Sequence, residues 1–140
     1  MTETHTAHSN TEAVVNQFFT EFAARNSDAM LALFAEQVDF QVVGSANVPW
    51  TGSRTTHGEI AAFIDSVLND VDTQKFEVDN IIVDGRNCVV LGTFEHRIKR
   101  TARTFGSPFA LHIAVEDNKI STYRMYEDSY SAALAFACDS

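Results

Sequence analysis

The stretch FALHIAVEDNKISTYRMYEDS, from Phe109 to Ser129, decides the fold class. Apolar and polar side chains alternate before and after the tetrapeptide Glu116-Asp117-Asn118-Lys119, a pattern typical of two half-buried strands joined by a tight turn. Residues 76–83 and 88–104 alternate in the same way around a second turn at residues 84–87. The second half of the chain is therefore expected to form an antiparallel sheet.

The first half of the chain has a helical period instead. Apolar residues recur at three- and four-residue steps in residues 11–25, 27–36 and 58–70, which predicts three helices with one apolar face each. A short strand is predicted at residues 38–44, and Gly106-Ser107-Pro108 is expected to separate two of the later strands. Helices followed by strands predict an α+β domain, with N-terminal helices packed on one face of a curved antiparallel β-sheet.

Composition limits the classes of partner. The chain has 140 residues and a net charge of −9, from 10 basic and 19 acidic residues, which fits one domain and argues against nucleic-acid and anionic-membrane partners. Residues 1–10 are polar and expected to be disordered, so the domain is predicted to span residues 11–140. The absence of an apolar leader or span predicts a cytoplasmic location. Dispersed histidines predict no metal site, and no cofactor is expected.

Four short segments stand out by their order and spacing: LFAEQVDF (residues 33–40), HGEIAAF (57–63), VEDNKIS (115–121) and YRMYEDS (123–129). Together they resemble the NTF2-like superfamily, in particular its SnoaL-like and ketosteroid-isomerase-like branch. The resemblance implies a cone-shaped, cystatin-like fold with a pocket between the helices and the sheet. It does not imply one activity, because this frame hosts isomerases, hydrolases, cyclases and non-catalytic binders.

The resemblance also gives positions at which known chemistry can be checked. Ketosteroid isomerases use a Tyr and a protonated Asp to bind the oxyanion, and a second Asp as the catalytic base. The resemblance places the Tyr at Phe18, the catalytic base at Val42 and the oxyanion-binding Asp at Leu111 of this chain. The Asp-Arg-Asp triad of limonene-epoxide-hydrolase-like members falls near Met125, His96 and Ile98. The steroid isomerase set and the epoxide hydrolase triad are thus both expected to be absent.

Strand alternation indicates which side chains face the pocket. The predicted ligand pocket is mostly apolar, as small-molecule sites usually are, and consists of Phe18, Phe22, Phe34, Val42, Trp50, Phe63, Phe94, Ile98, Leu111, Ile113, Tyr123 and Met125. His96 and Glu127 share this face and are the predicted catalytic pair, as general base and acid. The alternative is a hydrogen-bonded core histidine and a carboxylate at the rim. Trp50 is interpreted as a lid over the pocket or a plug at a dimer edge.

Two functions remain open on the sequence. One is a protein that binds a small hydrophobic molecule and transforms it by acid–base isomerase, hydrolase or cyclase chemistry. The other is a non-catalytic module that binds a ligand or a protein. A homodimer through the outer sheet face is also expected, because Leu91, Ala110, Ala114 and Tyr126 lie there among charged residues.

Overall fold

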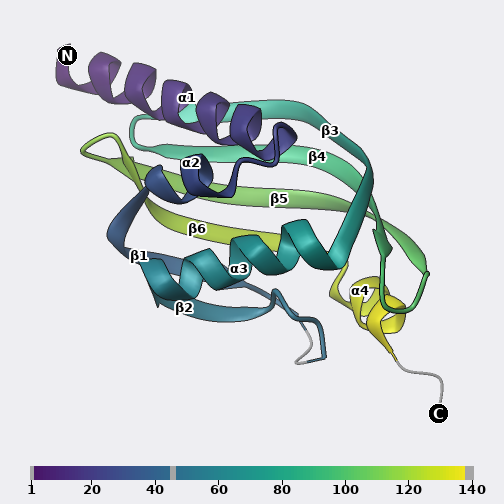
Figure 1. The fold of residues 1–140 in the computed structure, drawn as a ribbon. Coiled ribbons are helices and arrows are strands. Elements are labelled where there is room, and N and C mark those ends of the chain that lie inside the picture. Colours follow the sequence, from purple (N-terminus) through teal and green to yellow (C-terminus); the bar gives the residue numbers. More distant parts are fainter. Residues whose placement is uncertain (1, 45–46, 138–140) are drawn as a thin grey trace.

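The computed structural model describes residues 2–44 and 47–137, and in this part of the chain four helices accompany one sheet of six strands. The helices α1, α2 and α3 lie over one face of the sheet, and α4 lies at one end of it (Figure 1). The elements in chain order are α1 Thr2–Ala23, α2 Ser27–Ala32, β1 Phe34–Val42, β2 Gly52–Thr56, α3 His57–Asp70, β3 Val71–Asp84, β4 Asn87–Ile98, β5 Thr104–Glu116, β6 Lys119–Glu127 and α4 Ser129–Phe136.

The sheet has the order β2-β1-β6-β5-β4-β3. We expected an antiparallel sheet, but one pair of neighbouring strands is parallel. The pairs from β6 to β3 are antiparallel, but β1 runs parallel to β6. Tight turns force the hairpin partners to be antiparallel, whereas β1 and β6 are separated by most of the chain and either orientation is open to them. The fold is therefore α+β, with a mixed and mostly antiparallel sheet.

Helix α1 is longer than the sequence pattern predicts. It begins at Thr2, so residues 2–10, for which we expected disorder, are part of the helix. Thr11 lies in the interior of α1, and its hydroxyl donates a hydrogen bond of 2.9 Å to the carbonyl of Gly85 in the turn between β3 and β4. This bond ties α1 to one end of the sheet.

Strand β5 passes through Gly106-Ser107-Pro108, where we expected a break. The register pairs Pro108 with Thr93 of β4, while the pairing of β5 with β6 begins only at Phe109. Pro108 therefore lies where β5 has one neighbouring strand, and such edge positions are where proline is tolerated in a sheet. Strand β4 in turn ends at Ile98, earlier than the predicted residue 104.

Helix α3 is fixed at its start by a capping box. The Thr56 hydroxyl accepts from the backbone N–H of Glu59, and the Glu59 carboxylate accepts from the backbone N–H of Thr56. His57 follows the cap, and its Nε2 lies 2.8 Å from the carbonyl oxygen of Phe34. This contact connects α3 to the start of β1.

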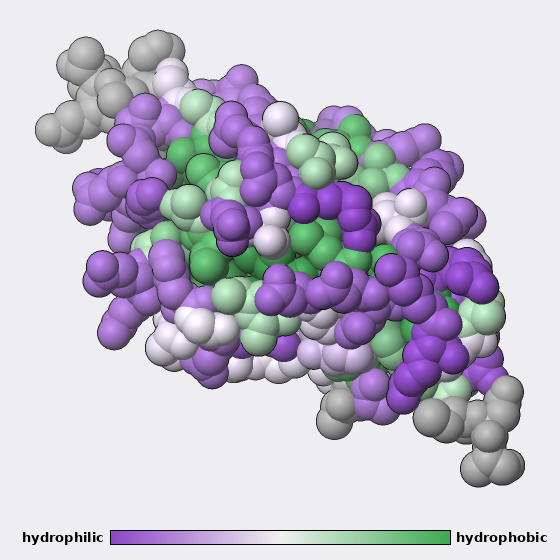
Figure 2. All heavy atoms as spheres, viewed as in Figure 1, coloured by the Kyte–Doolittle hydropathy of each residue, from purple (hydrophilic) through white to green (hydrophobic). Residues whose placement is uncertain are grey.

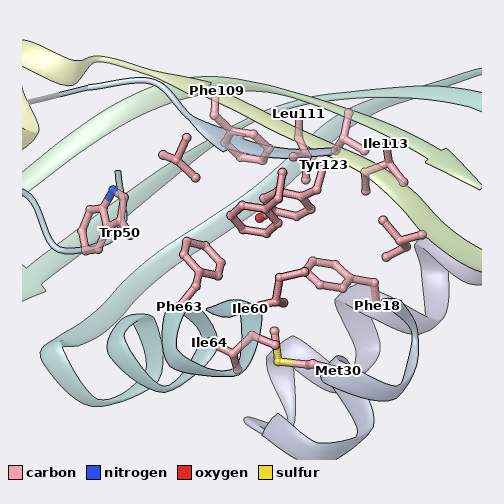
Figure 3. Packing of buried hydrophobic residues seen from close by; sticks show 14 of the residues in the cluster. Phe18, Met30, Trp50, Ile60, Phe63, Ile64, Phe109, Leu111, Ile113 and Tyr123 are labelled. Atoms are coloured by element: carbon pink, nitrogen blue, oxygen red, sulfur yellow. The ribbon is translucent and has the colours of Figure 1, made fainter. Parts of the chain in front are cut away.

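The core lies between the helices and the inner sheet face, and its centre is aromatic (Figure 3). Tyr123 stacks flat on Phe40, with ring centroids 4.6 Å apart and an interplanar angle of 5°. Phe18 and Phe63 pack edge-on against the same Tyr123 ring. Such contacts add to the stabilisation that comes from burial and hold the β6 side chains in fixed positions.

The outer sheet face carries two large exposed residues that the dimer prediction named. Leu91 is 36% exposed and Tyr126 is 46% exposed, while Ala110 and Ala114 are half-buried. The homodimer through this face stays a prediction. Within the described residues, no helix is both long and apolar enough to span a membrane.

Candidate functional site

A cavity of about 70 Å³ lies between the helices and the inner sheet face. Its walls are almost entirely apolar. The lining residues are Phe18, Phe19, Phe22, Met30, Val42, Trp50, Phe63, Ile64, Val67, Leu68, Phe76, Phe94, His96, Leu111, Tyr123, Met125 and Glu127. Six lining residues are only half-buried: Phe19, Phe22, Val67 and Phe76 on α1, α3 and β3, and Met125 and Glu127 on β6. We call the side of the cavity between α1, α3 and β3 its mouth. Apolar atoms are visible between the helices on this side of the molecule, bordered by hydrophilic residues (Figure 2).

The structure places most of the predicted pocket residues on this cavity. Those that line it are Phe18, Phe22, Val42, Trp50, Phe63, Phe94, Leu111, Tyr123 and Met125, together with His96 and Glu127. Phe34, Ile98 and Ile113 do not line it and are buried elsewhere in the core. Strand alternation selects the inner face correctly for these three, but it does not show where along that face the helices leave space.

Sequence reasoning missed six lining residues: Phe19, Met30, Ile64, Val67, Leu68 and Phe76. All six were assigned to helices or strands with an apolar face, so their burial was expected. Their position at the cavity depends on how α1 and α3 lie across the sheet. Phe76 contacts Phe22 and Phe109, which joins the mouth of the cavity to the sheet.

Glu127, near the end of β6, is the carboxylate of the cavity. The indole Nε1–H of Trp50 donates a hydrogen bond of 2.8 Å to Oε1 of Glu127. Burial raises the pKa of Glu127 to about 7, although the hydrogen bond from Trp50 acts in the opposite direction, and the nearby charge of Asp128 raises it further. Glu127 therefore changes its charge near neutral pH, where a group suited to proton transfer is expected to do so.

Trp50 forms part of the cavity wall and is only 4% exposed. Its ring packs edge-on against Phe136 of α4, with centroids 5.0 Å apart. Arg54 of β2 donates to the Trp50 carbonyl at 3.0 Å, and its guanidinium lies 5.0 Å from the centre of the Phe63 ring. Trp50 is thus a fixed plug held by its own chain, and Arg54 holds the loop that carries it.

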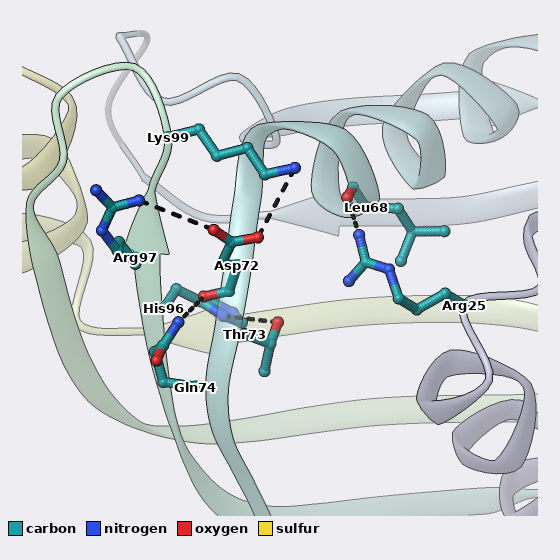
Figure 4. Close-up of polar contacts among 8 residues, drawn as sticks. All are labelled: Arg25, Leu68, Asp72, Thr73, Gln74, His96, Arg97 and Lys99. Atoms are coloured by element: carbon teal, nitrogen blue, oxygen red, sulfur yellow. Dashed lines mark hydrogen bonds and ion pairs between the residues drawn. The ribbon is translucent and has the colours of Figure 1, made fainter.

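His96, on β4, is buried in the same cavity but is bonded differently (Figure 4). Its Nδ1 lies 3.1 Å from the Thr73 hydroxyl, and its ring stacks on Phe94 with centroids 4.3 Å apart. Burial lowers the pKa of His96 to about 4, so the imidazole is neutral at neutral pH.

The structure does not join His96 directly to Glu127. Among the described residues no hydrogen bond links the two side chains, and Trp50 contacts both of them. The Trp50 and His96 rings are 6.0 Å apart at an angle of 67°. The sequence pattern did not reveal Trp50 as the hydrogen-bond partner of Glu127, because Trp50 comes from a loop 77 positions away along the chain.

Tyr123 adds a second polar group to the cavity. Burial, together with the nearby Glu127 charge, raises the pKa of Tyr123, so its hydroxyl stays protonated. Within the described part of the chain this hydroxyl has no hydrogen-bond partner. The cavity therefore offers a titrating carboxyl and a hydroxyl donor from the same face of β6.

The positions at which the resemblance implied other catalytic residues are apolar in the structure as well. Phe18, Val42 and Leu111 all line the cavity, and each is less than 5% exposed. Among residues 2–44 and 47–137, no group of three His, Cys, Asp or Glu side chains is arranged to hold a metal ion. The polar chemistry of the cavity consequently comes from Glu127, Tyr123, His96 and Trp50.

Comparison with known proteins identifies the family. The family model for the SnoaL-like domain matches residues 15–123, which covers most of the chain. The chain belongs to the SnoaL-like domain family. Its fold is the NTF2-like and ketosteroid isomerase-like fold, as the resemblance implied.

Individual relatives of this SnoaL-like chain differ in how far they match. Patulin synthesis protein F from Aspergillus clavatus is 34% identical over 97 residues, which cover 66% of this chain and 48% of the relative. The chain thus spans about half the length of this curated relative. An NTF2-like protein from Burkholderia xenovorans LB400 superimposes with a TM-score of 0.84 at 25% identity, over 93% of this chain and 98% of that one.

A third relative shares the fold alone. An LEH-like epoxide hydrolase from M. tuberculosis superimposes with a TM-score of 0.73 at 16% identity, over 92% of this chain and 90% of that one. The fold therefore accommodates different chemistry, and the activity of this chain has to be argued from its own cavity.

Proposed function

We propose that this chain is an acid–base catalyst that acts on a small apolar molecule held in the cavity. The observation that carries the proposal is the Glu127 carboxyl, which is held by Trp50 inside an apolar cavity and has its pKa raised to about 7. Near neutral pH, a carboxylate of this kind accepts a proton readily, because burial has weakened its preference for the charged form.

Three side chains have separate roles in this proposal. Glu127 takes a proton from the bound molecule and returns it at another position or to another group. The Tyr123 hydroxyl donates a hydrogen bond to the oxygen on which negative charge develops. His96 is neutral and forms part of the wall, with its position fixed by Thr73.

One relative supports small-molecule chemistry in the family. It is named for the synthesis of patulin, so a protein related to this chain is connected with the production of a small organic compound. The apolar lining of the cavity supports a ligand of the same general kind.

A carbon acid that needs no specific recognition can test the proposed role of Glu127. Loss of a proton from 5-nitrobenzisoxazole opens its ring to a coloured cyanophenolate, so the rate of proton removal can be followed by absorbance. We expect the wild-type protein at pH 8 to accelerate this reaction at least tenfold more than Glu127→Gln, because the amide keeps the size of the side chain and cannot accept the proton.

Glu95→Gln is the matched control. Glu95 is an exposed carboxylate next to His96 in the sequence, and its replacement changes the net charge by the same amount. We expect it to react like the wild type. Equal rates for the wild type and Glu127→Gln would contradict catalysis by Glu127. They would favour the second candidate, a non-catalytic binder, which the apolar residues Phe18, Val42 and Leu111 support.

A further inference from the structure

Arg25 is exposed beside two residues of the cavity wall, Phe22 and Leu68, and has a backbone conformation that arginine seldom adopts. It follows α1 and has a φ of 56°, in the left-handed region. The backbone N–H of Arg25 bonds to the carbonyl of Phe22, and that of Asn26 bonds to Glu21, both at 3.0 Å. This is a Schellman motif, and its left-handed position usually belongs to glycine because a Cβ is unfavourable there.

The side chain of Arg25 extends from the end of α1 to the end of α3 (Figure 4). Its Nη2 donates to the carbonyl of Leu68, and both Leu68 and Phe22 line the cavity. The guanidinium is therefore bonded to α3, while the backbone N–H of Arg25 is bonded to Phe22 of α1. The half-buried Phe22 and Val67 leave apolar surface open near these contacts.

Arg25 pairs with no carboxylate in the described part of the chain. Lys119 likewise bonds a single carbonyl, that of Ala32, but neither of these two residues lines the cavity. Arg86, Arg97 and Lys99 pair with carboxylates, whereas Arg25 has the Leu68 carbonyl as its sole partner there. A guanidinium carries five N–H donors, so most of those on Arg25 are open to a ligand. In a chain with a net charge of −9, Arg25 thus places a cation without a carboxylate partner next to a residue of the cavity wall, Leu68.

We infer that Arg25 is a specificity residue that binds the carboxylate of an otherwise apolar ligand, whose body enters the cavity. This inference rests on the proposed small-molecule site and adds the chemical class of the ligand. A planar carboxylate accepts two parallel N–H bonds from one guanidinium, which suits a single arginine better than a phosphate does. The apolar walls accept the rest of the molecule.

The test compares 3-phenylpropionate with its neutral analogue 3-phenylpropionamide by calorimetry at pH 6. At this pH the probe is an anion while most of the Glu127 side chains are protonated, so Glu127 does not repel it. We expect the wild type to bind the carboxylate at least tenfold more tightly than the amide. Both probes should also change the fluorescence of Trp50, the sole tryptophan and part of the cavity wall.

Arg25→Gly is the variant that decides the question, because glycine favours the left-handed backbone of this position and the fold is retained. We expect it to bind the two probes within twofold of each other, with unchanged affinity for the amide. Arg86→Gln, which alters an exposed pair with Glu116, is the control for net charge and should keep the preference.

The outcomes separate the inference from the proposed function. Equal binding of the two probes by the wild type, or a preference that survives in Arg25→Gly, would overturn the role of Arg25 and leave the ligand site intact. Binding of neither probe would contradict the small-molecule site itself.

Discussion

We expect the free energy of unfolding of Glu127→Gln, relative to that of the wild type, to increase as the pH rises from 4.5 to 7. Burial raises the pKa of Glu127 from its ordinary value of 4.5 to about 7 in the folded chain. Between these values the folded state binds more protons than the unfolded state, so the Glu127 contribution to stability falls with rising pH. At roughly 1.4 kcal/mol per pKa unit, the expected change is about 3 kcal/mol.

His96 is expected to act with the opposite sign. Its pKa is lowered from 6.5 to about 4 in the folded chain, so between these values the unfolded state binds more protons. The His96 contribution to stability therefore rises with pH, also by about 3 kcal/mol. His96→Asn should lose stability relative to the wild type as the pH rises from 4 to 6.5, while Glu127→Gln gains it.

Urea unfolding of the wild type and both variants at several pH values between 4 and 8 measures these differences. Glu95→Gln, with an exposed carboxylate, should follow the wild type at every pH. Curves for Glu127→Gln and His96→Asn that ran parallel to the wild type would show that neither side chain is buried as the structure has it.

Gly92→Ala is expected to destabilise the protein by about 3 kcal/mol or more, as overpacking against backbone does. Gly92 is buried on β4, opposite Val78 of β3. A Cβ at this position would lie 2.1 Å from the backbone oxygen of Glu77 and 2.8 Å from two ring carbons of Phe109. The Glu77 carbonyl cannot move away without disrupting the pairing between β3 and β4, whose register is irregular at this point.

Gly58→Ala is the control for this substitution. Gly58 lies in the first turn of α3, and a Cβ there would meet nothing within 4 Å. We expect it to stabilise the protein by roughly 0.5–1 kcal/mol, because alanine favours the helix. Thermal unfolding of the two variants measures both effects. A Gly92→Ala protein as stable as the wild type would show that β3 does not lie this close to β4.

The sequence predicted the elements whose pattern is local. Alternation along residues 120–129 correctly assigned Tyr123, Met125 and Glu127 to one inner face, because side chains in a strand point to opposite faces in turn. The same argument correctly placed His96 on the inner face of β4. Helical spacing likewise assigned Phe18 and Phe22 to the buried side of α1.

Features that depend on distant contacts were not predictable in this way. Alternation reveals no partner for Glu127, and the structure supplies Trp50 from a loop whose course is set by Arg54 and α4. Pro108 indicated a break between two strands, but it lies within β5, just before the residue at which the pairing with β6 begins. Arg25 was assigned to the end of a helix, and its bond to the carbonyl of Leu68 depends on where α3 lies.

The pH titration of Trp50 tests the central claim most directly, because the chain contains one tryptophan and its indole N–H binds Glu127. Ionisation of Glu127 strengthens this bond and changes both the fluorescence and the indole ¹H–¹⁵N signal. We predict one transition with a midpoint near pH 7 that disappears in Glu127→Gln. A midpoint near 4.5, or a transition that persists in Glu127→Gln, would contradict the account of a buried acid–base group in the cavity.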